Sequence, residues 1–330
     1  MSVIPARDSR FLLALVGWVL ALPLFAHAHT RWFADGPLPP YFTSEPTGLY
    51  LAIWAIIGAV IVCMGIILER RGILQLSFLR PKDPHAFDRV ASTFSMVAGA
   101  FLMIAGTHEY LFSPNLSHDA GIPMTLIMLQ FLLGLSFLIG AFARVSAIAL
   151  ILLWIAGFIT AGWVAMLEDI WVLSTAVFIL IMGNDYFSIV PFKALGTRMR
   201  KYQSYALPIL RIGTGVTLFT LGFTEKILHP EFGINFLRQY DWNFMQLLGV
   251  PYSDYLFTLS AGSVEALFGL VFMLGIVTRI NALVLAVFFT IPLFLLGPIE
   301  LAGHVPHFAA VVLILLFGAG EHLKIVRGRS

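Results

Sequence analysis

Long runs of apolar residues, separated by short polar segments, dominate the chain. A helix needs roughly 20 apolar residues to cross a bilayer, and irregular backbone cannot face lipid without leaving its amides unpaired, so these runs predict membrane-spanning helices. We expect nine of them after the amino-terminal segment, at residues 49–68, 90–110, 124–142, 145–166, 170–189, 206–228, 254–277, 280–298 and 304–320. The pattern predicts an all-α, polytopic membrane protein.

Residues 1–28 have the pattern of a secretory signal. Arg7 and Arg10 precede an apolar stretch that ends in the small-x-small sequence Ala26-His27-Ala28, which is typical of a cleavage site. An uncleaved anchor helix is the alternative interpretation. In either case residues 29–89 comprise an outer segment and one leading transmembrane helix.

Composition supports lipid as the solvent of this protein. Hydrophobic residues make up 59% of the 330, charged residues only 12%, and the mean hydropathy is +0.90, which excludes an ordinary soluble domain. The net charge of +2 says little about partners; we expect the bilayer as the main one and no nucleic acid. The single cysteine, Cys63, lies within an apolar run, so no internal disulfide is possible.

The positions of the basic residues predict an orientation. When the nine helices are threaded from a cytoplasmic start, 17 of the 20 Lys and Arg residues fall inside, and only Arg31, Lys226 and Arg238 fall outside, as the positive-inside rule requires. If one helix were missed, every later loop would be assigned to the opposite side of the membrane. We therefore expect a bacterial inner-membrane protein whose mature amino terminus is outside and whose carboxyl terminus is cytoplasmic.

The chain also contains an internal repeat. Gly99, Gly106 and Glu109 match Gly215, Gly222 and Glu225 at a constant spacing of 116 residues. The pattern Gln130-x3-Gly134-x5-Gly140-x3-Arg144 matches Glu265-x3-Gly269-x5-Gly275-x3-Arg279 at a spacing of 135 residues. The difference of 19 residues indicates an insertion in the outer loop of the second copy.

This repeat predicts two four-helix units behind the leading helix, at 90–190 and 206–321, with a basic linker at 191–205 and a basic tail at 322–330. Each unit has an even number of spans, so the two copies are parallel rather than inverted. We expect the glycines to allow close helix packing. Arg144 and Arg279 are expected to anchor the cytoplasmic boundary by reaching toward lipid head groups.

The second copy resembles the DoxX family. The similarity is carried by Arg211-x-Gly213, Gly222-x2-Glu225-Lys226, Glu265-x3-Gly269-x5-Gly275-x3-Arg279 and an outer His-Val-Pro-His sequence, over about 206–320. The first copy departs from this pattern, with Ser95, Tyr110 and Gln130 in the places of Arg211, Lys226 and Glu265.

The resemblance implies a four-helix membrane subunit, of the kind that accompanies quinone-linked sulfur oxidation or another redox system. No nucleotide fingerprint, haem-attachment motif or paired-cysteine motif occurs in the chain. Any redox centre would therefore be the quinone itself or belong to a periplasmic or membrane partner. Whether this chain is itself an enzyme stays open; the resemblance implies one subunit of a quinone-linked oxidoreductase as one alternative.

Glu265 is the acidic residue that we expect nearest the bilayer midplane. A carboxylate there needs a partner or a proton, and a neutral acid could hydrogen-bond a quinone carbonyl. We expect Glu265, Glu225 and Lys226 to be the chemically active residues, with Glu265 and His304 binding the quinone. A packing hydrogen bond from Glu265 is the alternative. Glu168, by contrast, is expected at the wet outer boundary.

Histidines gather on the predicted outer side together with carboxylates. Imidazole and carboxylate suit copper or zinc, so His108, Glu109, His304 and His307 are metal candidates, although Pro306 favours a helix start between the last two. Signal cleavage would place His29 at the amino terminus, where its amine and imidazole could chelate copper.

Three functions remain open from the sequence. The first is a DoxX-like subunit that binds quinone in the outer half of the second unit. The second is a membrane protein that binds or transports a copper-type metal. The third is a non-catalytic scaffold for a periplasmic partner.

Overall fold

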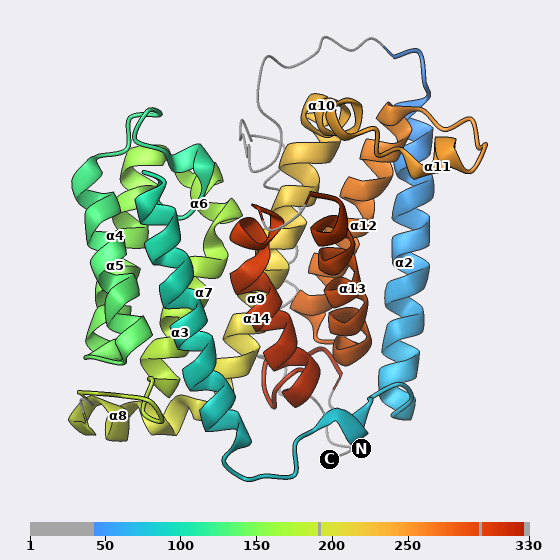
Figure 1. Ribbon diagram of the computed structural model, residues 1–330. Coiled ribbons are helices and arrows are strands. Elements are labelled where there is room, and N and C mark those ends of the chain that lie inside the picture. Colours follow the sequence, from blue (N-terminus) through green and yellow to red (C-terminus); the bar gives the residue numbers. More distant parts are fainter. Residues whose placement is uncertain (1–42, 191–192, 297–298, 327–330) are drawn as a thin grey trace.

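The computed structural model describes residues 43–190, 193–296 and 299–326. Within these ranges every regular element is a helix, and strand-like pairing is limited to two isolated bridges. The predicted all-α class is therefore confirmed. Figure 1 shows the long helices standing side by side, with the short helices α10 and α11 across one end and α8 at the other.

Five helical segments of the described chain are long and apolar enough to cross a membrane. They are α2 (Thr47–Arg71), α3 (Ala86–Thr107), α5 (Ala143–Ala161), the stretch Ala194–Ile227 that holds most of α8 (Lys193–Met199), α9 (Gln203–Leu221) and η5 (Gly222–Ile227), and α12 (Asp254–Leu274). The chain therefore has the character of a multi-pass membrane protein.

The remaining expected spans coincide with apolar helices that are shorter. These are α4 (Met124–Ile139), α7 (Ile170–Met182), and the parts Thr278–Thr290 of α13 (Thr278–Leu296) and His304–Phe317 of α14 (Ile299–Phe317). Three further short helices are α6 (Trp163–Glu168), α10 (Pro230–Tyr240) and α11 (Phe244–Leu247). The last two occupy the stretch between η5 and α12, where the repeat indicated an insertion.

Helices α3 and α4 pack through two glycines that the repeat singled out. A Cβ atom added to Gly99 would lie 2.5 Å from the carbonyl oxygen of Gly134. Helices α9 and α12 pack in the same way, since a Cβ atom on Gly215 would lie 2.7 Å from the carbonyl oxygen of Gly269. Small residues allow such approach where lipid supplies no hydrophobic drive for helix association.

Further contacts follow the same correspondence. Helix α5 packs on α7 as α13 packs on α14, while α7 packs on α9 and α14 packs on α3. Gly140 and Gly275 both end their helices in the left-handed region, with φ of 69° and 67°, a conformation that glycine adopts without steric cost. Matched residues therefore hold matched places in the two halves.

Three arginines cap helix ends rather than reaching outward to head groups. Arg144 donates to both carboxylate oxygens of Asp185, at 2.6 and 2.7 Å, and to the carbonyl of Met182 at the end of α7. Arg279 donates to the carbonyls of Leu315 and Leu316 at the end of α14. These carbonyls have no partner within their own helix, so the arginines satisfy them.

The third of these arginines, Arg211, begins the DoxX-like pattern and is fully buried. Its guanidinium donates to the backbone carbonyls of Phe272, Met273, Ala319 and Leu323. Arg211 thereby ties α9 to the ends of α12 and α14, which is a structural role.

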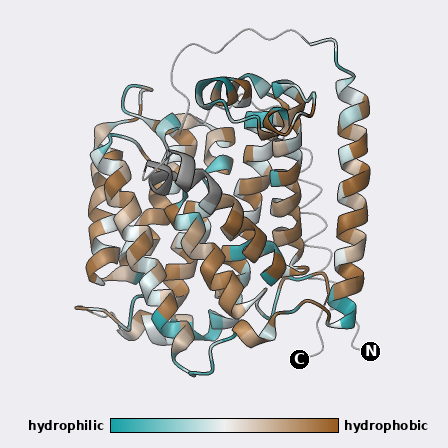
Figure 2. Ribbon diagram, turned by 45° about the vertical axis from the view of Figure 1, so that its right-hand side comes forward, coloured by the Kyte–Doolittle hydropathy of each residue, from teal (hydrophilic) through white to brown (hydrophobic). Residues whose placement is uncertain are grey.

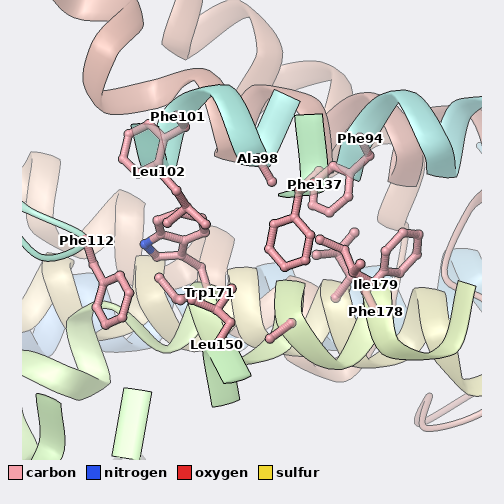
Figure 3. Packing of buried hydrophobic residues seen from close by; sticks show 14 of the residues in the cluster. Phe94, Ala98, Phe101, Leu102, Phe112, Phe137, Leu150, Trp171, Phe178 and Ile179 are labelled. Carbon is pink, nitrogen blue, oxygen red and sulfur yellow. The ribbon is translucent and has the colours of Figure 1, made fainter. Parts of the chain in front are cut away.

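Aromatic side chains fill the core between α3, α4, α5 and α7, as Figure 3 shows. Phe101 meets Trp171 edge to face at 5.2 Å, and Phe94 meets Phe178 in the same way. The same buried cluster continues through α9 and α14, so both halves share one core.

Helix α2 differs from the others because it lies at the periphery. Among its residues only Gly65 is buried, while Leu49, Ile56 and Met64 are more than half exposed. Figure 2 shows hydrophobic colour along nearly the whole helix. Such a large exposed apolar face is consistent with a lipid bilayer as the surroundings.

Candidate functional site

The chain leaves α9 through a π-helix, η5, whose sequence is Gly-Phe-Thr-Glu-Lys-Ile. Turns of this kind are frequent at functional sites. On the neighbouring helix α12, a Cβ atom added to Gly262 would lie 2.7 Å from the Cβ of Lys226. The missing side chain of Gly262 therefore lets Lys226 lie against α12, next to Glu265 one turn further along.

Lys226 and Glu265 form an ion pair with 2.6 Å between Nζ and Oε2. Their side chains are 27% and 22% exposed, so the pair is accessible from outside the helix bundle. The sequence analysis required a partner or a proton for the carboxylate of Glu265, and Lys226 is that partner.

Two more carboxylates face the same ammonium group. Glu225 precedes Lys226 in η5, and Glu168 comes from the end of α6; both attract the charge of Lys226. Opposite charges stabilise each other most where water is excluded. The site therefore joins residues from both halves of the chain around one lysine.

The structure corrects the expected position of Glu168. This residue is only 3% exposed instead of lying at a wet boundary, because α6 packs against α9 and carries Glu168 onto η5. Burial raises the pKa of Glu168 well above the ordinary carboxyl value of 4.5, and the neighbouring charge of Asp169 raises it further. The hydrogen bond with Thr224 and the charge of Lys226 lower this pKa in part.

The hydroxyl group of Thr224 lies between two hydrogen-bond acceptors. The hydroxyl oxygen of Thr224 lies 2.6 Å from Oε1 of Glu168 and 2.9 Å from the carbonyl oxygen of Thr220. A threonine hydroxyl has one proton, so Thr224 shares its proton between the carboxyl oxygen of Glu168 and the carbonyl oxygen of Thr220. The other carboxyl oxygen of Glu168, Oε2, is buried without a hydrogen-bond partner among the described residues.

Asp169 holds this region in place. Its carboxylate accepts a hydrogen bond from Ser113 at 2.7 Å and another from the indole nitrogen of Trp171 at 3.2 Å. Burial raises the pKa of Asp169 as well, while these two hydrogen bonds lower it. Trp171, on α7, belongs to the core shown in Figure 3. Asp169 thereby fixes the turn that presents Glu168.

The matching position of the first half, Gln130, forms no comparable site. Gln130 is 0% exposed. Its carboxamide accepts from the backbone nitrogen of Phe112 and donates to the carbonyls of Leu102 and Tyr110. All three donor and acceptor groups of this side chain are thus used within the protein.

His304 and His307 lie within α14, which begins at Ile299, so the expected helix start at Pro306 is wrong. The two histidines are three residues apart and share a helical face. The His304 ring lies 5.0 Å from Phe289, and the His307 ring lies 5.4 Å from Trp171. Aromatic neighbours therefore surround this face of α14.

The metal candidates do not assemble into a cluster within residues 43–190, 193–296 and 299–326, where no group of three or more His, Cys, Asp or Glu side chains is arranged to hold a metal ion. His108 stacks on Tyr110 at 5.8 Å, and both His108 and Glu109 are exposed. The predicted signal segment 1–28 and the copper candidate His29 lie outside the described residues.

Glu168 and Thr224 were not predicted as members of the site. The two adjacent acids Glu168 and Asp169, placed directly before an apolar run, were the available signal. Ionisable residues at the ends of membrane helices are costly to bury and are often functional.

No protein-family model matches the chain, no curated protein matches it, and no solved structure matches it.

Proposed function

We propose that this chain is a DoxX-like membrane subunit that binds a quinone beside Lys226 and thereby serves a membrane redox system. The accessible Lys226–Glu265 ion pair at the π-helix carries the proposal. It is supported by the two further carboxylates around the same lysine and by the DoxX-like sequence of these helices.

The proposal includes the architecture expected from the repeat. We infer nine spans, with α2 as the leading helix and two parallel four-helix units, α3 to α7 and α9 to α14. The matched glycine contacts of Gly99 with Gly134 and of Gly215 with Gly269 support this duplication. The distribution of basic residues supports an orientation in which the Lys226 end faces outward.

The residues around Lys226 suit a quinone. A quinone supplies carbonyl oxygens that accept hydrogen bonds and, when a membrane redox partner reduces it by two electrons, takes up two protons. The ammonium group of Lys226 can donate to a carbonyl oxygen. Glu168, whose pKa is raised by burial, retains a proton near neutral pH and can supply one of the two protons. The ammonium group of Lys226 can supply the other, and both groups then recover their protons from water.

The experiment measures binding of a short-chain quinone to the full-length protein in detergent. Replacing Lys226 by Met should weaken binding by about tenfold, since a hydrogen bond to a charged donor contributes about 1.5–3 kcal/mol. The control is Glu109→Gln, which changes an exposed residue and should bind quinone as the wild type does.

Metal analysis and lipid extraction of the same preparation distinguish the alternatives. Quinone without stoichiometric metal supports the proposal. Stoichiometric copper or zinc without saturable quinone binding would refute it in favour of metal handling. If neither quinone nor metal is found and the protein forms a stable complex with a periplasmic protein, the proposal would be refuted in favour of a scaffold.

A further inference from the structure

A cavity of about 960 Å³ lies at the amino-terminal end of α9. Lys226 lies in η5, which follows the other end of this helix. The α2–α3 connection, the start of α9, the start of α13 and the end of α14 form the walls of the cavity. Gln203 at the beginning of α9 lines it, and the 23 residues from there to Lys226 span roughly 35 Å at 1.5 Å per residue. The cavity is therefore distinct from the site described above.

Basic side chains dominate the charged lining of this cavity. They are Arg80, Lys82, Arg200, Lys201, Arg279 and Lys324. Three acids also line it, Glu69, Asp83 and Glu321. Two of these acids already have partners elsewhere, because Asp83 pairs with Arg89, which is outside the lining, and Glu69 accepts the backbone nitrogen of Val277 at 2.9 Å. The cavity thus has an excess of positive charge.

Two of these cations are held close to each other. Arg279 is fixed by hydrogen bonds to the carbonyls of Gln75, Leu315 and Leu316, and Arg80 lies near enough for the two charges to repel. Among the described residues, neither Arg80 nor Arg200 takes part in an ion pair. An anion between Arg80 and Arg279 would relieve their mutual repulsion.

The cavity also has an apolar wall. Phe87 and Phe317 meet edge to face at 4.9 Å, and Leu207 continues this surface. A phosphate group pairs well with arginine, whose planar guanidinium matches two of its oxygens, and the apolar wall suits the carbon chain that a phosphodiester carries. The volume is at the upper end for sites that enclose a small molecule, which leaves room for more than an inorganic ion.

We propose that this cavity binds a phosphate-bearing anion, with the head group of an anionic phospholipid as its source. Basic pockets between membrane helices bind such head groups in general. A free phosphate compound shares the chemistry, and the experiment separates the two sources.

The experiment uses the full-length protein in nanodiscs of phosphatidylcholine, titrated either with phosphatidylglycerol or with inorganic pyrophosphate, with binding followed by native mass spectrometry. The variant Arg80→Gln/Arg200→Gln removes two cavity arginines. The control Arg70→Gln/Arg71→Gln removes two exposed arginines from the last turn of α2, at the same end of the molecule but outside the cavity lining.

We expect phosphatidylglycerol to bind the wild type and the control alike, and the cavity variant about tenfold more weakly. Pyrophosphate binding that shows the same loss, without lipid binding, would retain the phosphate site but assign it to a free phosphate compound. Equal losses in both double variants, or no binding of either anion to the wild type, would overturn the proposal, since general surface charge would then explain the result.

Discussion

Gln130 in the first half and Glu265 in the second occupy matching places in the sequence repeat, but the side chain of Gln130 is buried whereas that of Glu265 is partly accessible. Gln130 uses its whole carboxamide on backbone groups and is 0% exposed. Glu265 pairs with the side chain of Lys226 and is partly accessible. In the first half the carbonyl of Tyr110, the residue matched to Lys226, takes the place of that ammonium group.

This difference teaches how one helix frame can serve two purposes. Close glycine contacts hold both helix pairs. Two exchanges, of Gln for Glu and of Tyr for Lys, distinguish a packing hydrogen bond in the first half from a charged pair in the second. The comparison can be tested first on the frame and then on the polar residues.

The largest effect is expected from the shared frame. Gly99→Ala and Gly215→Ala each place a methyl group less than 3 Å from a backbone carbonyl of the facing helix. The helices must separate, which should cost about 1–3 kcal/mol or more in each half. Thermal unfolding of the detergent-solubilised protein measures the loss.

Gly48→Ala is the control for both variants, because nothing lies within 4 Å of the Cβ that it adds; its unfolding temperature should stay unchanged or rise slightly. If Gly215→Ala is as stable as this control while Gly99→Ala is not, the two halves do not share one packing frame.

A smaller effect is expected from exchanging the matched polar residues. Gln130→Glu sets a carboxyl group against the carbonyls of Leu102 and Tyr110, to which the amide had donated. Loss of these donors should lower the free energy of unfolding by about 1–3 kcal/mol. Glu265→Gln can still accept from Lys226, so its unfolding temperature should change little.

Comparison of the two unfolding curves decides this point. If Gln130→Glu and the wild type were equally stable, the first half would tolerate a carboxyl group at this position as well as the second half does.

The smallest effect concerns the pH dependence of stability. Because the pKa of Glu168 is raised on folding, the folded protein keeps a proton that the unfolded chain releases. The stabilisation is therefore complete at low pH and declines as pH rises above the ordinary carboxyl range. Glu168→Gln removes this proton equilibrium, so its unfolding temperature should fall less than that of the wild type between about pH 5 and about pH 8.

Asp169, whose pKa is also raised, remains in both proteins and so cancels in this comparison. Identical pH profiles would mean that Glu168 stays ionised in its buried position. The difference should approach about 1.4 kcal/mol for each pH unit over which the folded state alone keeps this proton.

The sequence was sufficient for the helical segments and for the residues that bring the helices together. Each expected span coincides with a helix, because long apolar runs leave no other way to satisfy the backbone in lipid. The glycine matches also indicated which residues meet, since close packing requires small side chains at defined spacings.

The sequence was not sufficient where contacts between distant segments decide the outcome. Glu168 is buried because the end of α6 contacts η5. Its partner there, Thr224, is 56 residues further along the chain, so no local sequence pattern predicts this contact. Pro306 lies inside α14 although proline commonly starts a helix, because neighbouring helices can satisfy the backbone group that proline leaves unpaired.

One large hydrophobic cluster runs through both halves and restricts how the two halves can move relative to each other. Transporters that alternate their access rock one repeat against the other around a fixed site, and each cycle would have to open the α7–α9 and α14–α3 contacts. Densely packed cores resist such continuous deformation. For the proposed function, the shared core favours a stationary site that a quinone would reach sideways from the bilayer, rather than a passage that opens to each side in turn.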